Sequence, residues 1–144
     1  MIAGSHAHGR WLVLVVVAFI LGGGACSSEK KERTRQVDNA NIREMIAQFA
    51  TGASERDSEA FAGKTTESFD AAAFMDTLWA GVEAERVVFK VRRLRTSEGR
   101  SRAVFDVAFM TGESMVSGKF VAMEFAYLEG KWFADNFQLF GSNR

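Results

Sequence analysis

The sequence predicts an α+β domain, with helices in its first half and an antiparallel sheet in its second. Between residues 41 and 84, apolar side chains recur with the period of about 3.6 residues that is typical of an amphipathic helix, and after Arg86 the period changes to about two, as in a strand. Short glycine-containing turns separate the strand segments, which favours an antiparallel meander. With 144 residues and 47% hydrophobic content, the chain is long enough for one such domain and one additional segment.

The additional segment lies at the N-terminus. Residues 11–21 are all apolar, but as a helix they would extend only about 16 Å, against about 30 Å for the hydrocarbon core of a bilayer. We therefore expect them to form the apolar part of a secretory signal rather than a permanent membrane span. The small residues 22–25, followed by Cys26, complete the pattern.

The residues from Leu21 to Cys26 resemble a lipobox, the motif in which a small residue precedes a cysteine that becomes acylated, with Gly23 where that motif usually has leucine. The resemblance implies cleavage after Ala25 and a lipid anchor on Cys26 that holds the protein at a membrane. An ordinary signal peptide cut after Ala25 is the alternative, because Gly23 and Ala25 are both small. Acylation would account for a single cysteine in an oxidising compartment.

Removal of residues 1–25 would restrict the chemistry of the mature chain. Both histidines, His6 and His8, would be lost, and the one cysteine would be acylated. Ser-His-Asp and Cys-His catalysis, internal disulfides and nearly all structural zinc sites would then be excluded, and we expect no metal and no cofactor. The 18 basic and 18 acidic residues of the whole chain balance, which gives no indication of nucleic-acid binding.

The expected organisation has three parts: a lipoprotein signal peptide at 1–25, the lipidated cysteine and a charged tether at 26–38, and the α+β domain at 39–144. Residues 27–38 are polar and carry charges of both signs. They are interpreted either as a tether between anchor and domain or as a solvated start of the first helix.

Three helices are expected before the sheet. The first begins at Asn41, whose side chain can cap it, and ends near Gly52. A short second helix is expected at 58–61, and a third at 71–84 with Asp70 as its N-cap. The apolar face of the first helix consists of Ile42, Met45, Ile46 and Phe49.

The strands are expected at residues 87–94, 101–111, 115–128 and 131–140. The turns between them are expected at 97–99, 111–113 and 129–130. Both faces of the third and fourth strands carry large apolar residues. In the fourth strand, strict alternation places Phe133 and Phe137 on one face, and Trp132 and Phe140 on the other.

This order of elements resembles the nuclear-transport-factor-two-like superfamily, in which N-terminal helices pack on a curved, cone-like antiparallel sheet. The resemblance covers residues 40–140 and depends on the amphipathic first helix, on the turn at 56–61 and on the hairpin at 129–133. The superfamily includes ketosteroid isomerase, scytalone dehydratase, polyketide cyclases and many small bacterial lipoproteins of unknown role, so the fold does not define an activity. Its catalytic members have an Asp–Tyr or His–Asp pair in the cone. Tyr127, the only tyrosine here, lies near a turn, and no catalytic residue is carried over.

Three carboxylates lie within strands between apolar neighbours, namely Asp106, Glu124 and Asp135. A general acid or base in an apolar pocket, its pKa raised by burial, is one hypothesis for them. The other hypothesis is that they face solvent or pair across strands. For Asp106 the period of two favours this second hypothesis, because Asp106 shares a face with Arg102.

The aromatic residues suggest a second kind of site. A cone-shaped sheet is open at its mouth, so an apolar pocket could form there, or the same residues could simply pack as a core. The candidate pocket-lining residues are Phe74, Trp79, Phe105, Phe109, Met123, Phe125, Phe133 and Phe137. Because the opposite face of the third and fourth strands is also apolar, we expect it to be covered by a second copy of the chain or by another protein.

A basic cluster around the first hairpin is a third candidate. It could bind phosphate, anionic lipid or carboxylates, or it could be the charged edge strand that protects a sheet from aggregation. Its members are Lys90, Arg92, Arg93, Arg95, Arg100 and Arg102. Glu83, Glu85 and Glu98 could neutralise part of this charge.

The sequence thus predicts a membrane-anchored extracytoplasmic lipoprotein that is not an enzyme and that acts as a binding or assembly module, through a homodimer or an envelope protein partner. Binding of a small apolar ligand in the cone is the alternative, and an isomerase-like or hydrolase-like enzyme with a buried carboxylate is a further one. If the host has two membranes, Ser27 after Cys26 resembles the signal for sorting to the outer membrane, facing the periplasm.

Overall fold

The computed structural model describes the backbone of residues 9–141 and the side chains of residues 27–141. The chain forms two compact units, Met1–Gln36 and Val37–Arg144. The expected signal peptide at 1–25 and the side chain of Cys26 lie outside the residues described in full. In the described part of the chain, no helix combines the length and the apolar character needed to cross a membrane.

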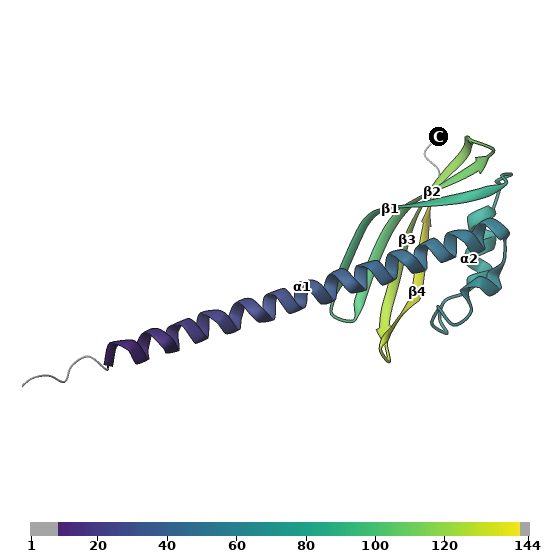
Figure 1. Ribbon diagram of the computed structural model, residues 1–144. Coiled ribbons are helices and arrows are strands. Elements are labelled where there is room, and N and C mark those ends of the chain that lie inside the picture. Colours follow the sequence, from purple (N-terminus) through teal and green to yellow (C-terminus); the bar gives the residue numbers. More distant parts are fainter. Residues whose placement is uncertain (1–8, 142–144) are drawn as a thin grey trace, which may run out of the picture. The chain divides into compact units, whose positions relative to one another are not determined.

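The predicted α+β order, with helices before an antiparallel sheet, is confirmed (Figure 1). The helical elements are α1 (Gly9–Glu55), the 3-10 helix η1 (Ser58–Phe61) and α2 (Ala71–Trp79). The strands are β1 (Arg86–Ser97), β2 (Arg100–Thr111), β3 (Ser114–Leu128) and β4 (Lys131–Phe140). All neighbouring strands are antiparallel, in the order β1-β2-β3-β4, so β1 and β4 are the edges of the sheet.

The first helix differs from the prediction at both ends. It does not begin at Asn41, because α1 already includes the charged residues 27–38, which are helical and mostly exposed. Gly52 does not end it, since α1 continues to Glu55. A Cβ atom at Gly52 would lie 2.4 Å from the Cβ of Ala60, so this glycine permits a close approach of η1 to α1.

A second difference from the prediction concerns α2, which ends at Trp79 rather than at Ala84. The chain turns at Gly81, which has a φ of 69°. The predicted N-cap is confirmed, because the Asp70 side chain accepts a hydrogen bond of 2.9 Å from the amide of Ala73.

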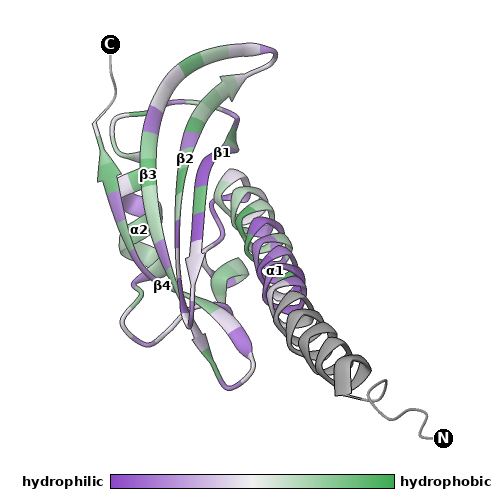
Figure 2. Ribbon diagram, turned by 90° about the vertical axis from the view of Figure 1, so that its left-hand side faces the viewer, coloured by the Kyte–Doolittle hydropathy of each residue, from purple (hydrophilic) through white to green (hydrophobic). Residues whose placement is uncertain are grey.

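The helices cover one face of the sheet, which we call the inner face. Apolar residues of α1, η1 and α2 form a single core cluster with the inward residues of the strands. The Phe49 and Phe61 rings stack at 4.4 Å between centroids, and the Phe61 and Phe74 rings meet edge to face at 5.6 Å. Along the strands, hydrophobic and hydrophilic residues alternate, as the coloured bands in Figure 2 show.

Lys119 fixes the C-terminal end of α2 on the inner face. Its ammonium donates to the carbonyls of Thr77, Leu78 and Ala80 at 3.1, 2.7 and 3.1 Å. These carbonyls belong to the last turn of the helix and to its C-cap residue, Ala80, where no intrahelical donor is available. Burial lowers the pKa of the Lys119 ammonium below its ordinary value.

A β-bulge in β4 changes the predicted faces of this strand. Phe125 of β3 pairs with Ala134, and the preceding Glu124 pairs with Asn136, so Asp135 is an extra residue without a partner on β3. Trp132 and Phe137 therefore both belong to the inner face, whereas Phe133 and Phe140 pair with outward residues of β3. The expectation that Phe133 shares a face with Phe137 is wrong, because strict alternation does not allow for the bulge.

The first residues of the domain are held at one end of the sheet. Asp38 accepts a hydrogen bond of 3.0 Å from the indole nitrogen of Trp132, just after the β3–β4 turn. Asn39 accepts a hydrogen bond of 2.6 Å from the hydroxyl of Thr96, just before the β1–β2 turn. The domain therefore begins beside these two turns, at the end of the sheet opposite to the β2–β3 turn.

Candidate functional site

The face of the sheet opposite to the helices, the outer face, carries a group of apolar side chains. We call this group the outer apolar patch. It consists of Val88, Val104, Phe120, Ala122, Phe133 and Phe140. Val88 and Phe140 are 40% and 47% exposed, while Ala122 is buried among its neighbours and is not part of the core cluster. The prediction that both faces of β3 and β4 are apolar is thus confirmed.

Arg92 links the apolar patch to charged residues of the outer face. It lies at a bulge in β1, pairs with the Asp106 carboxylate on β2, and lies over the ring of Phe120 on β3, 5.8 Å from its centroid. The other carboxylate oxygen of Asp106, Oδ1, is buried and has no hydrogen-bond partner among the residues that the structure describes.

A hollow of about 370 Å³ lies next to the patch, at the end of the sheet that carries the β1–β2 turn. We call it the arginine hollow. It is lined by Arg95, Ser97, Arg100, Ser101, Arg102 and Glu124. Arg95 and Arg102 are direct cross-strand partners, and Arg102 pairs in turn with Glu124 of β3, 3.6 Å away. Arg95 forms no ion pair within residues 27–141, the part described with side chains.

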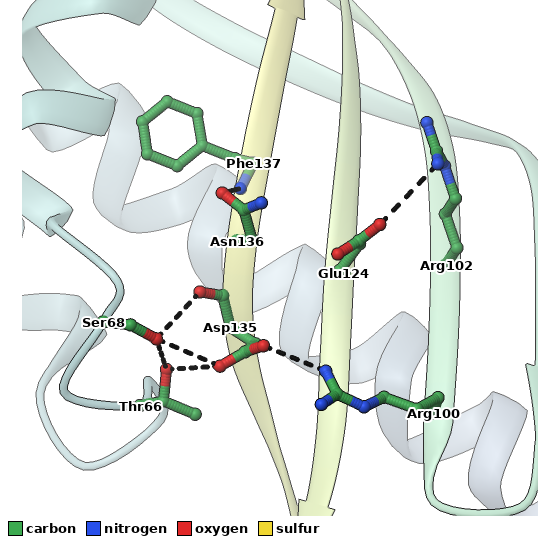
Figure 3. Close-up of polar contacts among 8 residues, drawn as sticks. All are labelled: Thr66, Ser68, Arg100, Arg102, Glu124, Asp135, Asn136 and Phe137. Carbon is green, nitrogen blue, oxygen red and sulfur yellow. Dashed lines mark hydrogen bonds and ion pairs between the residues drawn. The ribbon is translucent and has the colours of Figure 1, made fainter.

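Asp135 is the centre of a polar network beside this hollow (Figure 3). Its carboxylate accepts hydrogen bonds from Thr66 at 2.8 Å, from Ser68 at 3.1 Å and from Arg100 at 3.1 Å. These donors come from the loop before α2 and from β2, while Asp135 is the bulge residue of β4. The hydrogen bond from Thr66 is the main cause that holds the pKa of Asp135 below its ordinary value; burial opposes this, and Ser68 and Arg100 lower it further.

The same loop also pairs with β4 through its backbone. Thr65 forms a parallel bridge with Ala134, the amide of Thr66 donates to the carbonyl of Ala134, and the amide of Ala134 donates to the carbonyl of Lys64, each at 2.9 Å. The loop therefore covers part of an edge strand whose backbone would otherwise be open to pairing. Neither Thr66 nor Ser68 was predicted as a partner of Asp135, because no local pattern connects a loop to a strand that lies 67 and 69 residues away.

The three candidate carboxylates are each engaged by an arginine. Asp106 pairs with Arg92, Glu124 with Arg102 and Asp135 with Arg100. These contacts agree with the hypothesis that the carboxylates pair across strands, and not with the hypothesis of a carboxyl group in an apolar pocket. Tyr127 is 46% exposed and packs against Trp132, with 5.1 Å between the ring centroids. No carboxylate is placed against Tyr127 by the contacts of the described residues.

The candidate pocket-lining residues lie in three environments. Five are buried within the core cluster, namely Phe74, Phe105, Phe109, Met123 and Phe125. Trp79 and Phe137 are partly buried against it: the Trp79 ring is 5.2 Å from that of Phe109, and the Phe137 ring is 5.0 Å from that of Phe74. Phe133 lies on the outer face. The structure therefore brings seven of the eight together on the inner face, within the core cluster or packed against it.

The basic cluster lies on β1 and β2, and β1 is an edge strand, as expected. Its carboxylate partners differ from the predicted ones. Asp106, Glu124 and Asp135 pair with its arginines, whereas the Glu85 side chain accepts a hydrogen bond from the amide of Gly112 in the β2–β3 turn. In the described residues, no group of three or more His, Cys, Asp or Glu side chains is arranged to hold a metal ion.

Comparison with solved structures identifies the fold of the domain as NTF2-like. An NTF2-like protein of unknown function from Shewanella baltica OS155 has a TM-score of 0.55 and 13% identity, over 73% of this chain and 95% of that chain. A protein of unknown function from Mycobacterium tuberculosis has a TM-score of 0.57 and 15% identity, over 78% and 75% of the two chains. Hexachlorocyclohexane dehydrochlorinase LinA-type3 from Novosphingobium barchaimii LL02 has a TM-score of 0.53 and 13% identity, over 76% and 90%.

The fold resemblance therefore includes proteins of unknown function and an enzyme, and at these identities it establishes the fold alone. No protein-family model and no curated protein matches the sequence. The expected nuclear-transport-factor-two-like architecture, with helices packed on a curved four-stranded antiparallel sheet, is confirmed.

Proposed function

We propose that this chain is a lipid-anchored extracytoplasmic lipoprotein whose domain is a non-catalytic assembly module, and that it forms a homodimer through the outer apolar patch. The observation that carries the proposal is the exposure of large apolar residues on the outer face, led by Phe140 and Val88. Exposed apolar groups of this kind are characteristic of surfaces that bind a partner.

The distribution of small and large side chains on the outer face favours a partner that is itself a sheet. Several positions of β3 on this face are small, with Gly118 on one side of Phe120, and Ala122 and Ala126 on the other side, toward the β3–β4 turn. Two sheets that pack face to face interdigitate their side chains across about 10 Å. The aromatic residues Phe120, Phe133 and Phe140 could then occupy the space above the small residues of a second copy.

The charges around the patch also support self-association. Acidic and basic side chains lie in the same rows, with Lys90 opposite Asp106, and Arg102 opposite Glu124. A surface with both signs can be complementary to a copy of itself, as a two-fold interface requires. Charged residues at the margin of an apolar centre are also the usual composition of a protein interface.

Analytical ultracentrifugation of residues 27–144 tests the dimer. At about 1 mM protein, an interface worth only about 4 kcal/mol is half occupied. We expect the wild type to dimerise and Phe140→Asp to be monomeric, because a carboxylate would be buried in the interface. Val37→Asp is the matched control, since Val37 is an exposed apolar residue of α1. A wild type that stays monomeric at this concentration would contradict self-association, and a complex with an envelope protein would then have to be sought.

The anchor is tested separately. The proposal predicts that membrane-extracted protein begins at Cys26 and carries acyl chains, and that Cys26→Ser releases it from the membrane fraction. Intact-mass spectrometry distinguishes the outcomes, because a product that keeps residues 1–25 or an unmodified Cys26 would contradict lipidation. Fractionation of a host with two membranes would then test the outer membrane as its location.

A further inference from the structure

We propose that the arginine hollow is a binding site for a phosphate group. The proposal is independent of the outer apolar patch and goes beyond assembly, because it assigns a ligand chemistry to a different part of the outer face. The phosphate could belong to a soluble phosphate ester or to the headgroup of a phospholipid, and the experiment below separates these two sources.

The arrangement of the arginines is the first observation. The register of β1 and β2 places Arg95 directly opposite Arg102, and like charges in that position disfavour strand pairing. The nearest carboxylate in the row, Glu124, lies 3.6 Å from Arg102 and forms an ion pair with no other arginine of residues 27–141. An anion between the two guanidinium groups would convert this repulsion into attraction.

The unused hydrogen-bond donors are the second observation. Arg95 has no ion pair among residues 27–141, and Arg100 uses one nitrogen, Nη1, to reach Asp135 at 3.1 Å. Figure 3 shows Arg100 extending from β2 across β3 to Asp135, whereas Arg102 runs along β2 and pairs with Glu124. Guanidinium groups that arrive from different strands suit a tetrahedral anion with several acceptor oxygens, and Arg is the residue that most often binds phosphate in this way.

The walls of the hollow are the third observation. Ser101 is almost completely buried, and its hydroxyl is within hydrogen-bond distance of Thr96, which is itself bonded to Asn39 of α1. These bonds hold the β1–β2 end of the sheet to the start of the domain. The hollow, about 370 Å³, is a depression that is largely open to solvent, so a bound phosphate would stay accessible from outside.

The location makes both sources accessible. Asn39 fixes the first residues of the domain beside the same turn that carries Arg95 and Arg100. Residues 27–38 are helical, and even fully extended the chain between Cys26 and Asn39 would span at most about 45 Å. A membrane anchor at Cys26 would therefore keep phospholipid headgroups within reach, and this part of the argument depends on the proposed lipidation.

The test uses residues 27–144, because every residue of the core cluster lies between Ile42 and Ala134. Nitrogen-15 NMR follows the arginine side chains and the backbone during titration with inorganic phosphate. We expect shifts at Arg95, Ser101 and Arg102 that saturate in the millimolar range, and at least about ten-fold weaker binding in Arg95→Gln/Arg102→Gln.

Lys90→Gln/Arg93→Gln is the matched control. This double variant also loses two positive charges, but both residues are in β1 and neither lines the hollow. It should therefore bind phosphate as the wild type does. Equal weakening in both double variants would overturn the proposal in favour of diffuse charge attraction. The absence of any saturable shift in the wild type would overturn it as well.

Vesicle sedimentation identifies the source. Binding to phosphatidylglycerol vesicles, absent with phosphatidylcholine and lost in Arg95→Gln/Arg102→Gln, would assign the phosphate to a lipid headgroup. Saturable binding of inorganic phosphate without vesicle binding would assign it to a soluble ester. The monomeric Phe140→Asp variant should retain phosphate binding, so failure of the dimer and failure of this site give different results.

Discussion

At the scale of single residues, Asp135 joins three segments that are distant in the chain. It accepts hydrogen bonds from the loop at Thr66 and Ser68 and from Arg100 on β2, and it occupies the bulge of β4. Because these donors stabilise the ionised carboxylate, its pKa in the folded protein is lowered from 3.8. A lowered pKa contributes stability above the unfolded-state value, and this contribution is lost as the pH falls through the folded value.

We therefore predict that Asp135→Asn lowers the free energy of unfolding at pH 7, and that its difference from the wild type shrinks as the pH falls below about 4. Urea denaturation at a series of pH values measures both variants. Asp76→Asn, at an exposed position of α2, is the control and should show little effect at any pH. A difference that stays constant down to pH 3 would mean that the ionised state of Asp135 is not what stabilises the network.

Lys119 is a charged residue at a position of β3 that faces the helices. We predict that Lys119→Met lowers the free energy of unfolding by about 1–3 kcal/mol, because three carbonyls at the end of α2 lose their donor. Chemical denaturation measures the effect, and Lys131→Met, an exposed lysine of β4, is the control. Equal stability of the two variants would show that water replaces the ammonium without cost.

At the scale of elements, the contact between α1 and η1 depends on a missing side chain. A Cβ at Gly52 would lie 2.4 Å from that of Ala60, so Gly52→Ala must push the two elements apart. In an open helix the same substitution stabilises by about 1 kcal/mol, but overpacking of a tight contact costs about 1–3 kcal/mol. We predict a net loss of stability in thermal denaturation. Gly141→Ala, which meets no neighbour within 4 Å, should behave as the wild type, and a more stable Gly52→Ala would contradict the contact.

The strands were more predictable than the helix ends. The candidate pocket-lining residues of the strands at 101–111 and 115–128 all lie on the inner face, because these strands pair without interruption over most of their length. They are Phe105, Phe109, Met123 and Phe125. The bulge at Asp135 was not predictable, since the extra residue is stabilised by Thr66 and Ser68, which are far away in the sequence. The expected start of α1 at Asn41 is wrong for another reason: Asn41 and Glu44 form a plausible capping pattern, but the charged residues before them are themselves able to form a helix. Of the two interpretations of residues 27–38, the solvated start of the first helix agrees with the structure.

Part of the candidate site could also be predicted from the sequence. The apolar outer face and the basic cluster follow directly from residue order and the period of two. The carboxylate partners of the arginines cannot be predicted in this way, because they depend on the register between the four strands. The role of Lys119 could have been predicted from the sequence. The period of two places this lysine on the same face as Ser117 and Val121, which is the inner face, where a charged group needs partners.

At the scale of the whole molecule, the domain contains its complete core. Residues 27–36 of α1 are exposed, whereas Asp38 and Asn39 hydrogen-bond to Trp132 and Thr96. We predict that a chain beginning at Val37 unfolds with the same free energy as one beginning at Ser27, and that a chain beginning at Ala40 is less stable by about 1–2 kcal/mol. Urea denaturation of the three chains makes the comparison. A large loss on removal of residues 27–36 would contradict the independence of the domain.

The bulge in β4 also determines where the length of this chain can change. Removal of Asp135 or of Asn136 would leave one residue between Ala134 and Phe137, which is the spacing of a regular strand. Removal of a residue elsewhere in β4 would shift the register of one part of the strand by one position. The side chains of that part would then point to the opposite face of the sheet, so that buried residues would become exposed. Homologues that lack one residue here could therefore keep both surfaces of the sheet unchanged.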